Sequence, residues 1–258
     1  MLPARRDHCL RTLVQASAPT ARIVCLPHSG GTAAGYGAWA AGVPAGVELL
    51  AAQYPGHGDR FGEPLSTDVR TLGAELASAL LRLPPLPTVL FGHSLGALVA
   101  YETALTLGTL GRAPSGLLVS SCPAPGTRGR IRARGVSDGE LWSLIRSLGG
   151  IDPAVADEPE LVEVLLPVLR ADITAHEEYR PEPATTPLSC PLRCYHGIRD
   201  PLVDTTLLSG WASVTTGPFS LREREGHHFH PFQDAEHLLA DITAFLDTAL
   251  HPDSLTRS

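Results

Sequence analysis

Residues 88–104 read TVLFGHSLGALVAYETA, and this stretch decides the fold. An apolar run ends at Gly92, and an apolar helical pattern begins directly after Ser94. Between them, Gly92-His93-Ser94-Leu95-Gly96 matches the pattern G-x-S-x-G. In this context the pattern predicts a sharp strand-to-helix turn that exposes a nucleophilic serine. Small glycines on both sides give the backbone room for such a turn.

Short apolar runs of the same kind recur along the chain, and each stops at a Gly or Pro turn. Continuous apolar runs are typical of strands that are covered on both faces of a parallel sheet. A further N-terminal strand is expected near residues 10–14. The predicted strands cover residues 22–26, 47–53, 88–91, 117–121, 192–196 and 219–223.

Helical patterns separate these runs. Ser66 or Thr67 is expected to cap a helix that ends near Leu83, and another helix is expected over 95–110. A last helix is expected over 233–250, with one apolar face. The alternation predicts one α/β domain over 1–258, with a mostly parallel sheet flanked by helices. We therefore expect the α/β-hydrolase fold.

The stretch 123–191 is far longer than one crossover between strands needs. Ser137 with Glu140 three residues later forms a capping-box pattern. A second helix is expected from Pro159 to about Tyr179, with a kink at Pro167. Active sites of open α/β sheets lie at the carboxyl ends of the strands. We therefore expect this insertion to be a helical lid over those ends, although an ordinary insertion packed on the sheet has the same pattern.

A serine hydroxyl needs a base, and in this fold the order along the chain is Ser, acid, His. Asp200 directly follows a predicted strand, and Asp204 is its rival. The base is expected in the cluster His227, His228 and His230 after the last strand. Such a cluster is a weak metal signal, because its spacing is irregular and no second ligand motif accompanies it. We expect no metal and no cofactor.

The oxyanion hole requires backbone N–H donors. One is expected from Leu95, the residue after the nucleophile. The other is expected from the first loop, 27–31, where Ser29 is favoured over Gly30. A plain strand-to-helix turn would also favour the glycines of this loop.

Composition excludes several classes of protein. The chain has 258 residues, of which 43% are hydrophobic, and a net charge of -7, so a disordered chain is excluded and a nucleic-acid binder is disfavoured. No apolar run is long enough to span a membrane, and the N-terminus has no secretory h-region. Five cysteines at irregular spacing favour buried thiols in a cytoplasmic protein.

Taken together, the motifs resemble those of the type II thioesterases of polyketide and nonribosomal peptide pathways, over nearly the whole chain. The segment YPG-x-x-DR-x-x-EP discriminates best, because generic esterases lack it. In the family the base is the histidine of a Gly-Gly-His-Phe signature, which corresponds here to His228. Two departures are His28-Ser29, where the family often has an aromatic residue and alanine, and Cys122, where it often has arginine. The matching segments are LPHSGG (26–31), QYPGHGDRFGEP (53–64), FGHSLGALVAYETA (91–104), LLPVLRAD (165–172), GIRDPLV (197–203) and GHHF (226–229).

The resemblance implies a free-standing editing enzyme that hydrolyses acyl thioesters from the phosphopantetheine arm of acyl or peptidyl carrier proteins. The implied triad is Ser94, Asp200 and His228. A generic carboxylesterase, an acyltransferase and a non-catalytic carrier-binding module are the alternatives. The basic run Arg128, Arg130, Arg132 and Arg134 suits docking of an acidic carrier protein or of the pantetheine phosphate, and suits a solvated surface loop equally well.

Overall fold

The computed structural model describes residues 8–127, 130, 132–149, 158–183 and 185–250. One seven-stranded sheet has the order β1-β3-β2-β4-β5-β6-β7. Strand β1 pairs with β3 in the antiparallel sense, and all other neighbours are parallel. The strands are β1 (Leu10–Val14), β2 (Ala21–Leu26), β3 (Val47–Ala52), β4 (Thr88–His93), β5 (Gly116–Ser120), β6 (Leu192–Gly197) and β7 (Phe219–Arg224).

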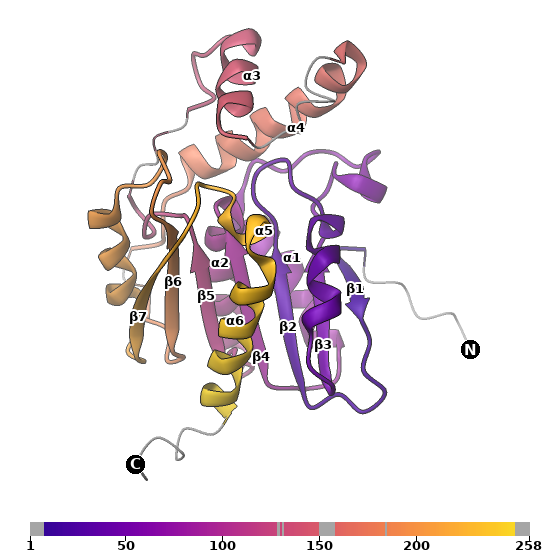
Figure 1. Cartoon of the computed structure of the whole chain (residues 1–258), viewed down its shortest axis with the longest axis vertical. Coiled ribbons are helices and arrows are strands. Elements are labelled where there is room, and N and C mark those ends of the chain that lie inside the picture. The colour runs from indigo at the N-terminus through magenta and orange to yellow at the C-terminus, as the bar shows by residue number, and fades with distance from the viewer. Residues whose placement is uncertain (1–7, 128–129, 131, 150–157, 184, 251–258) are drawn as a thin grey trace.

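Helices cover both faces of the sheet, and each face has its own hydrophobic cluster (Figure 1). One cluster joins the sheet to α1 (Val69–Arg82) and α2 (Leu95–Thr109). The other joins it to the 3₁₀ helix η1 (Ala33–Gly42) and to α6 (Ala235–Leu250). Side chains alternate between faces along a strand, and β2, whose six residues are all buried, therefore serves both clusters. The prediction of an α/β fold from continuous apolar runs is confirmed.

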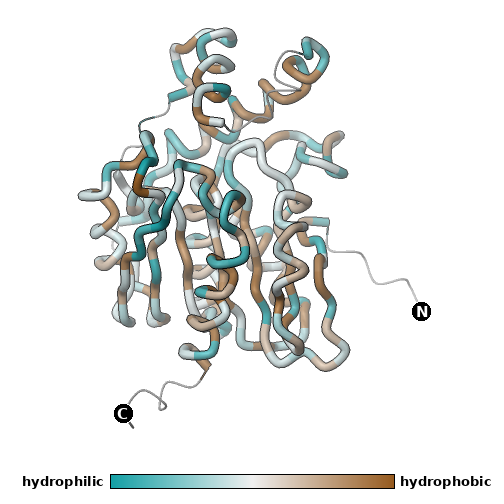
Figure 2. Tube along the Cα trace, in the orientation of Figure 1, coloured by the Kyte–Doolittle hydropathy of each residue, from teal (hydrophilic) through white to brown (hydrophobic). Residues whose placement is uncertain are grey.

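Two helices from the segment between β5 and β6 lie above the carboxyl ends of the strands (Figure 1). They are α3 (Asp138–Ser147) and α4 (Pro159–Glu178). The predicted capping box at Ser137 and Glu140 is present. These helices share a small cluster that includes Trp142, Ile145 and Leu169. Figure 2 shows brown, hydrophobic stretches in the central strands, whereas brown and teal segments alternate along α3 and α4.

The structure corrects three details of the sequence prediction. Helix α1 is capped by Asp68 and not by Ser66 or Thr67, since the Asp68 carboxylate accepts the Arg70 N–H. The expected helix over 233–250 is present as α6 from Ala235 to Leu250, and a separate short helix, α5 (His230–Gln233), which was not predicted, precedes it. The 3₁₀ helices η1, η2 (Gly58–Arg60) and η3 (Thr205–Val214) were not predicted, because periodicity rules target longer elements.

None of the helices in the described ranges is long and apolar enough to cross a membrane.

Candidate active site

Ser94 occupies the turn between β4 and α2 with φ 54° and ψ −120°. This backbone conformation is strained for a residue with a Cβ atom. A Cβ on Gly92 would lie 2.1 Å from the Gly96 oxygen, and a Cβ on Gly96 would lie 2.1 Å from the Leu26 oxygen. Both glycines are therefore required for the close approach of α2 to the sheet. The Ser94 N–H donates to the Ser120 oxygen at 2.8 Å, which anchors the turn to β5.

Asp200 and His228 meet although they stand in loops after different strands, β6 and β7. The His228 Nδ1 atom lies 2.8 Å from the Asp200 Oδ2 atom, and both side chains are buried. The second carboxylate oxygen of Asp200 accepts the Leu202 N–H at 2.9 Å. Burial raises the pKa of Asp200, but the hydrogen bond and charge of His228 outweigh it, so that the pKa lies below its ordinary value. The carboxylate is therefore ionised at neutral pH and oriented toward the imidazole.

The rival residues of the sequence analysis have other contacts. Asp204 is the half-buried N-cap of η3, where it accepts the Thr206 N–H at 3.0 Å and lies 3.8 Å from Arg130. His227 is exposed, and its Nδ1 atom lies 3.1 Å from the Arg199 oxygen. His230 is the first residue of α5, and its Nε2 atom lies 3.1 Å from the Ser120 hydroxyl. Of the three histidines, His228 is the one that contacts Asp200.

Ser94 and His228 line one cavity together with Ser29 of the first loop. The wall formed by α3 and α4 is mostly apolar, with Ile145, Leu148, Leu169 and Ile173 and one polar side chain, His176. Trp142 packs in the cluster between the two helices and is not among the lining residues. The cavity therefore joins the serine and the histidine to a hydrophobic compartment.

The first loop runs over the amino end of α2, and hydroxyl groups hold it there. Tyr36 donates to the Leu26 oxygen and Tyr54 to the Pro27 oxygen, both at 3.1 Å. The Gly30 N–H donates to Asp172 at 2.7 Å, so this donor, the rival for the oxyanion hole, is occupied. Ser29 lines the cavity, and Leu95 begins α2.

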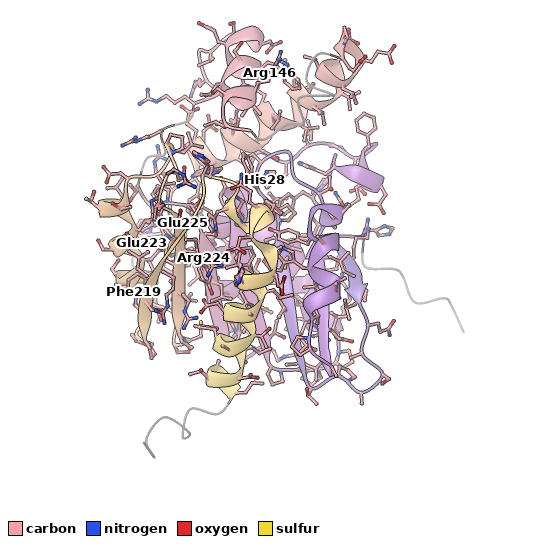
Figure 3. The ribbon with its side chains drawn as sticks, in the orientation of Figure 1. His28, Arg146, Phe219, Glu223, Arg224 and Glu225 are labelled. Atoms are coloured by element: carbon pink, nitrogen blue, oxygen red, sulfur yellow. The ribbon has the colours of Figure 1, made fainter. Side chains whose placement is uncertain are left out.

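Neutral histidines surround His228, a feature that the sequence analysis missed. The His93 ring lies 5.1 Å from the His228 ring, and its Nδ1 atom is 3.1 Å from the Ser120 hydroxyl. His28, labelled in Figure 3 below the two upper helices, packs edge-on against His93 and Phe229. Burial lowers the pKa of His28 to about 4 and that of His93 well below its ordinary value. The position of His93 inside G-x-S-x-G was the available signal for a residue under the site.

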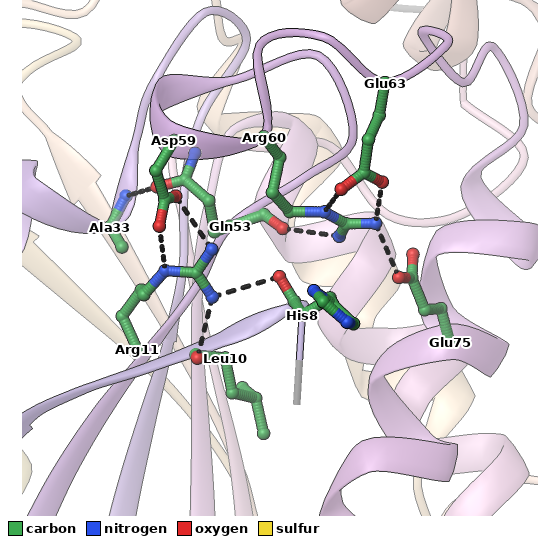
Figure 4. Close-up of polar contacts among 9 residues, drawn as sticks. All are labelled: His8, Leu10, Arg11, Ala33, Gln53, Asp59, Arg60, Glu63 and Glu75. Atoms are coloured by element: carbon green, nitrogen blue, oxygen red, sulfur yellow. Dashed lines mark hydrogen bonds and ion pairs between the residues drawn. The ribbon is translucent and has the colours of Figure 1, made fainter. Parts of the chain in front are cut away.

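The segment 53–64 is a loop organised by Arg60 (Figure 4). The Arg60 guanidinium donates to the main-chain carbonyl oxygen of Gln53 and to the carboxylates of Glu63 and Glu75. Asp59 lies at the surface and pairs with Arg11 at 2.7 Å. The most discriminating part of the sequence therefore builds a rigid loop next to the site, and its acidic and basic residues hold that loop together.

Of the basic run, Arg128 lies outside the described residues. Arg130 is exposed at the cavity and donates to the Pro201 oxygen at 3.1 Å. Arg132 is exposed, and Arg134 lies 3.6 Å from Glu178. Within the described ranges, no group of three or more His, Cys, Asp and Glu side chains is placed to hold a metal ion.

The parallel sheet, the turn that carries Ser94 and the flanking helices define an α/β-hydrolase. The thioesterase domain family matches residues 21–246, and the chain belongs to this family. The chain is 36% identical over 244 residues to the probable cadicidin biosynthesis thioesterase of Streptomyces griseus, and this alignment covers 95% of this chain and 66% of that protein. It is 36% identical to the thioesterase PikA5 of Streptomyces venezuelae, over 87% of this chain and 80% of that protein.

Among solved structures, the type II thioesterase BorB from the borrelidin biosynthetic cluster superimposes with a TM-score of 0.84. It shares 34% sequence identity, over 92% of this chain and 97% of that one. The resemblance to type II thioesterases that the sequence motifs indicated is confirmed, and so is the α/β-hydrolase fold.

Proposed function

We propose that the protein hydrolyses acyl thioesters from the phosphopantetheine arm of carrier proteins, as an editing enzyme of a polyketide or nonribosomal peptide synthase. One observation carries this proposal. His228, paired with Asp200 at 2.8 Å, lines the same cavity as Ser94 of the strained turn, and that cavity has a mostly apolar wall. Carboxylate, imidazole and hydroxyl in this order are the groups that acyl transfer to serine requires.

In the first half of the reaction, Ser94 Oγ attacks the thioester carbonyl carbon while His228 Nε2 takes the hydroxyl proton. Asp200 holds the imidazole by its Nδ1–H and stabilises the cation that forms. The carbon–sulfur bond then breaks, His228 returns its proton to the departing thiolate, and the acyl group remains on Ser94. In the second half, His228 deprotonates a water molecule that attacks the acyl-serine, which releases a carboxylic acid and restores the serine.

The negative oxygen of each tetrahedral intermediate is stabilised by the N–H groups of Ser29 and Leu95. The Leu95 N–H begins α2, where free backbone donors and the helix dipole favour negative charge. The engagement of the Gly30 N–H by Asp172 supports Ser29 as the second donor.

The segment 123–191 serves as the lid of a single domain and forms the acyl compartment. Its apolar side chains Ile145, Leu148, Leu169 and Ile173 fit the hydrocarbon part of an acyl group. A closed compartment also limits access of bulk water to the acyl-serine, so that the lid controls the hydrolytic step.

Carrier docking is assigned to the lid's basic run, Arg128, Arg130, Arg132 and Arg134. Arg130 of this run lines the cavity. The relatives named above serve antibiotic-type pathways, which supports a carrier protein as the partner. All five cysteines are buried and free of disulfides, which supports a reducing, cytoplasmic setting.

The test is a hydrolysis panel. The same acyl groups are presented on a carrier protein, on a small thiol and as oxygen esters, with release of free acid as the measurement. We expect thioesters to be preferred over oxygen esters, and carrier-bound acyl groups over small-thiol ones. Preference for oxygen esters would identify a generic esterase instead, and transfer of the acyl group to an alcohol or amine without free acid would identify an acyltransferase.

A further inference from the structure

Asp172 is a buried carboxylate in the middle of lid helix α4, and only 1% of its surface is exposed. Its Oδ2 atom accepts the Gly30 N–H at 2.7 Å and lies 2.9 Å from the His57 Nε2 atom. Gly30 belongs to the first loop and His57 to the loop that Arg60 organises. One oxygen atom of the lid therefore joins two loops that border the serine.

The first loop lies directly against α4 at this point. Gly30 has φ +74°, and a Cβ on it would lie 2.6 Å from the Leu169 side chain, one turn before Asp172. A side chain at position 30 would therefore separate the loop from the helix. Glycine is needed both for the backbone conformation and for the contact.

The contacts of His57 favour a charged ring. Its Nδ1 atom lies 2.9 Å from the Pro55 oxygen and its Nε2 atom 2.9 Å from the Asp172 carboxylate. When this carboxylate is ionised, both neighbours accept hydrogen bonds, so that both ring nitrogens donate, and a ring with two N–H groups is a cation. Burial lowers the pKa of His57, but the hydrogen bond and charge of Asp172 outweigh it and leave the pKa raised. The imidazolium compensates the buried carboxylate, which then accepts a charge-assisted hydrogen bond from Gly30.

Hydrogen bonds restrain consecutive peptide groups of the first loop. The Gly31 N–H donates to the His28 oxygen at 2.9 Å, and this oxygen belongs to the same peptide group as the Ser29 N–H. The Ser29 oxygen in turn accepts from His28 Nδ1 at 2.9 Å. Asp172 holds the next peptide group, so its bond to Gly30 fixes the direction of the Ser29 N–H.

We propose that Asp172 is a positioning residue for the oxyanion hole, and that lid helix α4 is thereby part of the catalytic machinery. This inference rests on the proposed function and adds a specific role for the lid. When α4 leaves the site, the Gly30 bond breaks and the Ser29 N–H loses its direction. Formation of the oxyanion hole is coupled to lid closure.

The test compares Asp172→Ala and Asp172→Asn on a short acyl thioester of a small thiol, with kcat expressed per active serine titrated by a fluorophosphonate. For Asp172→Ala we expect kcat to fall about 10²-fold with KM changed less than twofold, as for loss of one oxyanion donor. Asp172→Asn keeps an oxygen that accepts the Gly30 N–H, and we expect it to stay within about tenfold of the unmodified protein.

Tyr179→Phe is the matched control. The Tyr179 hydroxyl donates to Glu102 at 2.5 Å at the far end of α4, so its loss loosens the same helix without touching the first loop. We expect its kcat to stay within twofold. Gly30→Ala is a second variant, independent of the buried charge, and we expect it to lower kcat as Asp172→Ala does.

Three results would overturn the inference: a loss in Asp172→Ala confined to KM or to the titratable fraction, an equal kcat loss in Tyr179→Phe, or an equal loss in Asp172→Asn. If Asp172→Ala does not fold, Gly30→Ala decides alone, and an unchanged kcat in it contradicts the inference. Failure of the proposed function would give a different result, because the unmodified protein itself would then not hydrolyse the thioester.

Discussion

The sheet and the lid differ in how they are held. Side chains on both faces of the sheet are buried under helices, and they form the two large clusters of the molecule. The lid helices share one small cluster of their own, which includes Leu141 and Ile145. Ser94, Asp200 and His228 follow strands β4, β6 and β7, whereas most of the apolar cavity wall belongs to α3 and α4. The proposed reacting groups are therefore held by the large core around the sheet. The proposed access of substrate depends on the α3 and α4 segment, which is stabilised mainly by its own small cluster.

Polar contacts of α4 attach the lid to the rest of the molecule. They include the Asp172 contacts to the two loops and the Tyr179 hydrogen bond to Glu102. At its carboxyl end, Ala175 of α4 also packs into the cluster that joins the sheet to α1 and α2. Inside the lid, Arg170 pairs with Asp138 at 2.5 Å and so ties α4 to α3. A unit attached by a few polar contacts and a small apolar edge opens at lower free energy than one held by a large apolar core.

The largest expected effect comes from Ser94→Ala on the sheet. We expect kcat to fall about 10⁴-fold or more, because the nucleophile is gone, while the fold is retained. Steady-state thioester hydrolysis and circular dichroism measure the two quantities. Residual activity within tenfold of the unmodified protein would contradict the assignment of the nucleophile.

The next effect separates the two candidate acids. Asp200→Asn is expected to lower kcat about 10³- to 10⁴-fold, because the amide no longer holds the imidazole in the tautomer that accepts the serine proton. Asp204→Asn is the control, since this residue caps η3 and does not contact His228, and we expect less than a twofold change. His228→Ala and His227→Ala form the corresponding pair for the base. Larger loss in the Asp204 or His227 variant would reverse the assignments.

Core truncations test the difference in stability directly. Phe91 is fully buried in the sheet beside Trp39, and Phe91→Ala is expected to lower the free energy of global unfolding by about 3–5 kcal/mol. Trp142→Ala truncates the lid cluster. We expect it to leave global unfolding in denaturant nearly unchanged and to speed hydrogen exchange in α3 and α4. A common loss of global stability in both variants would mean that sheet and lid unfold as one unit.

The free energy of unfolding should depend on pH through buried histidines whose pKa values are lowered. Burial lowers the pKa of His28, His176 and His230 to about 4. In the unfolded chain these histidines have ordinary pKa values near 6.5. As the pH falls from about 6.5 toward 4, the unfolded state therefore binds protons that the folded state does not, and this favours unfolding. The free energy of unfolding should therefore fall over that window, which calorimetry at several pH values measures.

The contribution of His57 to stability depends on pH in the opposite direction. Because its pKa is raised, its contribution is complete below about pH 6.5 and is lost as the pH rises through the raised value. Hydrogen exchange in α4 should then quicken on the alkaline side, and Asp172→Asn should remove that response. An α4 exchange profile that follows the intrinsic rate at all pH values would contradict this.

The smallest effect concerns the basic run. Arg132 and Arg134 are exposed and lie outside the cavity lining, so the double alanine variant should leave small-thiol hydrolysis unchanged. Hydrolysis of carrier-bound acyl groups should fall severalfold at low salt and lose part of its salt dependence. Equal loss on both substrates would indicate a structural role for the run, and no loss on either would indicate a solvated surface.

Local signals in the sequence were sufficient for much of this protein. Strands and helices follow from short-range patterns, and the turn at Ser94 follows from glycines that leave no room for a Cβ atom. The edge strand over Leu10–Val14 and the capping box at Ser137 were predicted in the same way. Such features depend on residues within a few positions of one another, so that the sequence by itself determined the fold class and the place of the nucleophile.

Contacts between distant loops were decided only by the tertiary structure. The sequence left Asp200 and Asp204 as alternatives, and the twist and register of β6 and β7 bring Asp200 to His228, 28 residues away. The Asp172 bond to Gly30 spans 142 residues, and no local pattern marks it. The physical reason is that a short polar side chain finds its partner only after packing has fixed the helix and the loop, and the free energy of that packing is distributed over the whole core.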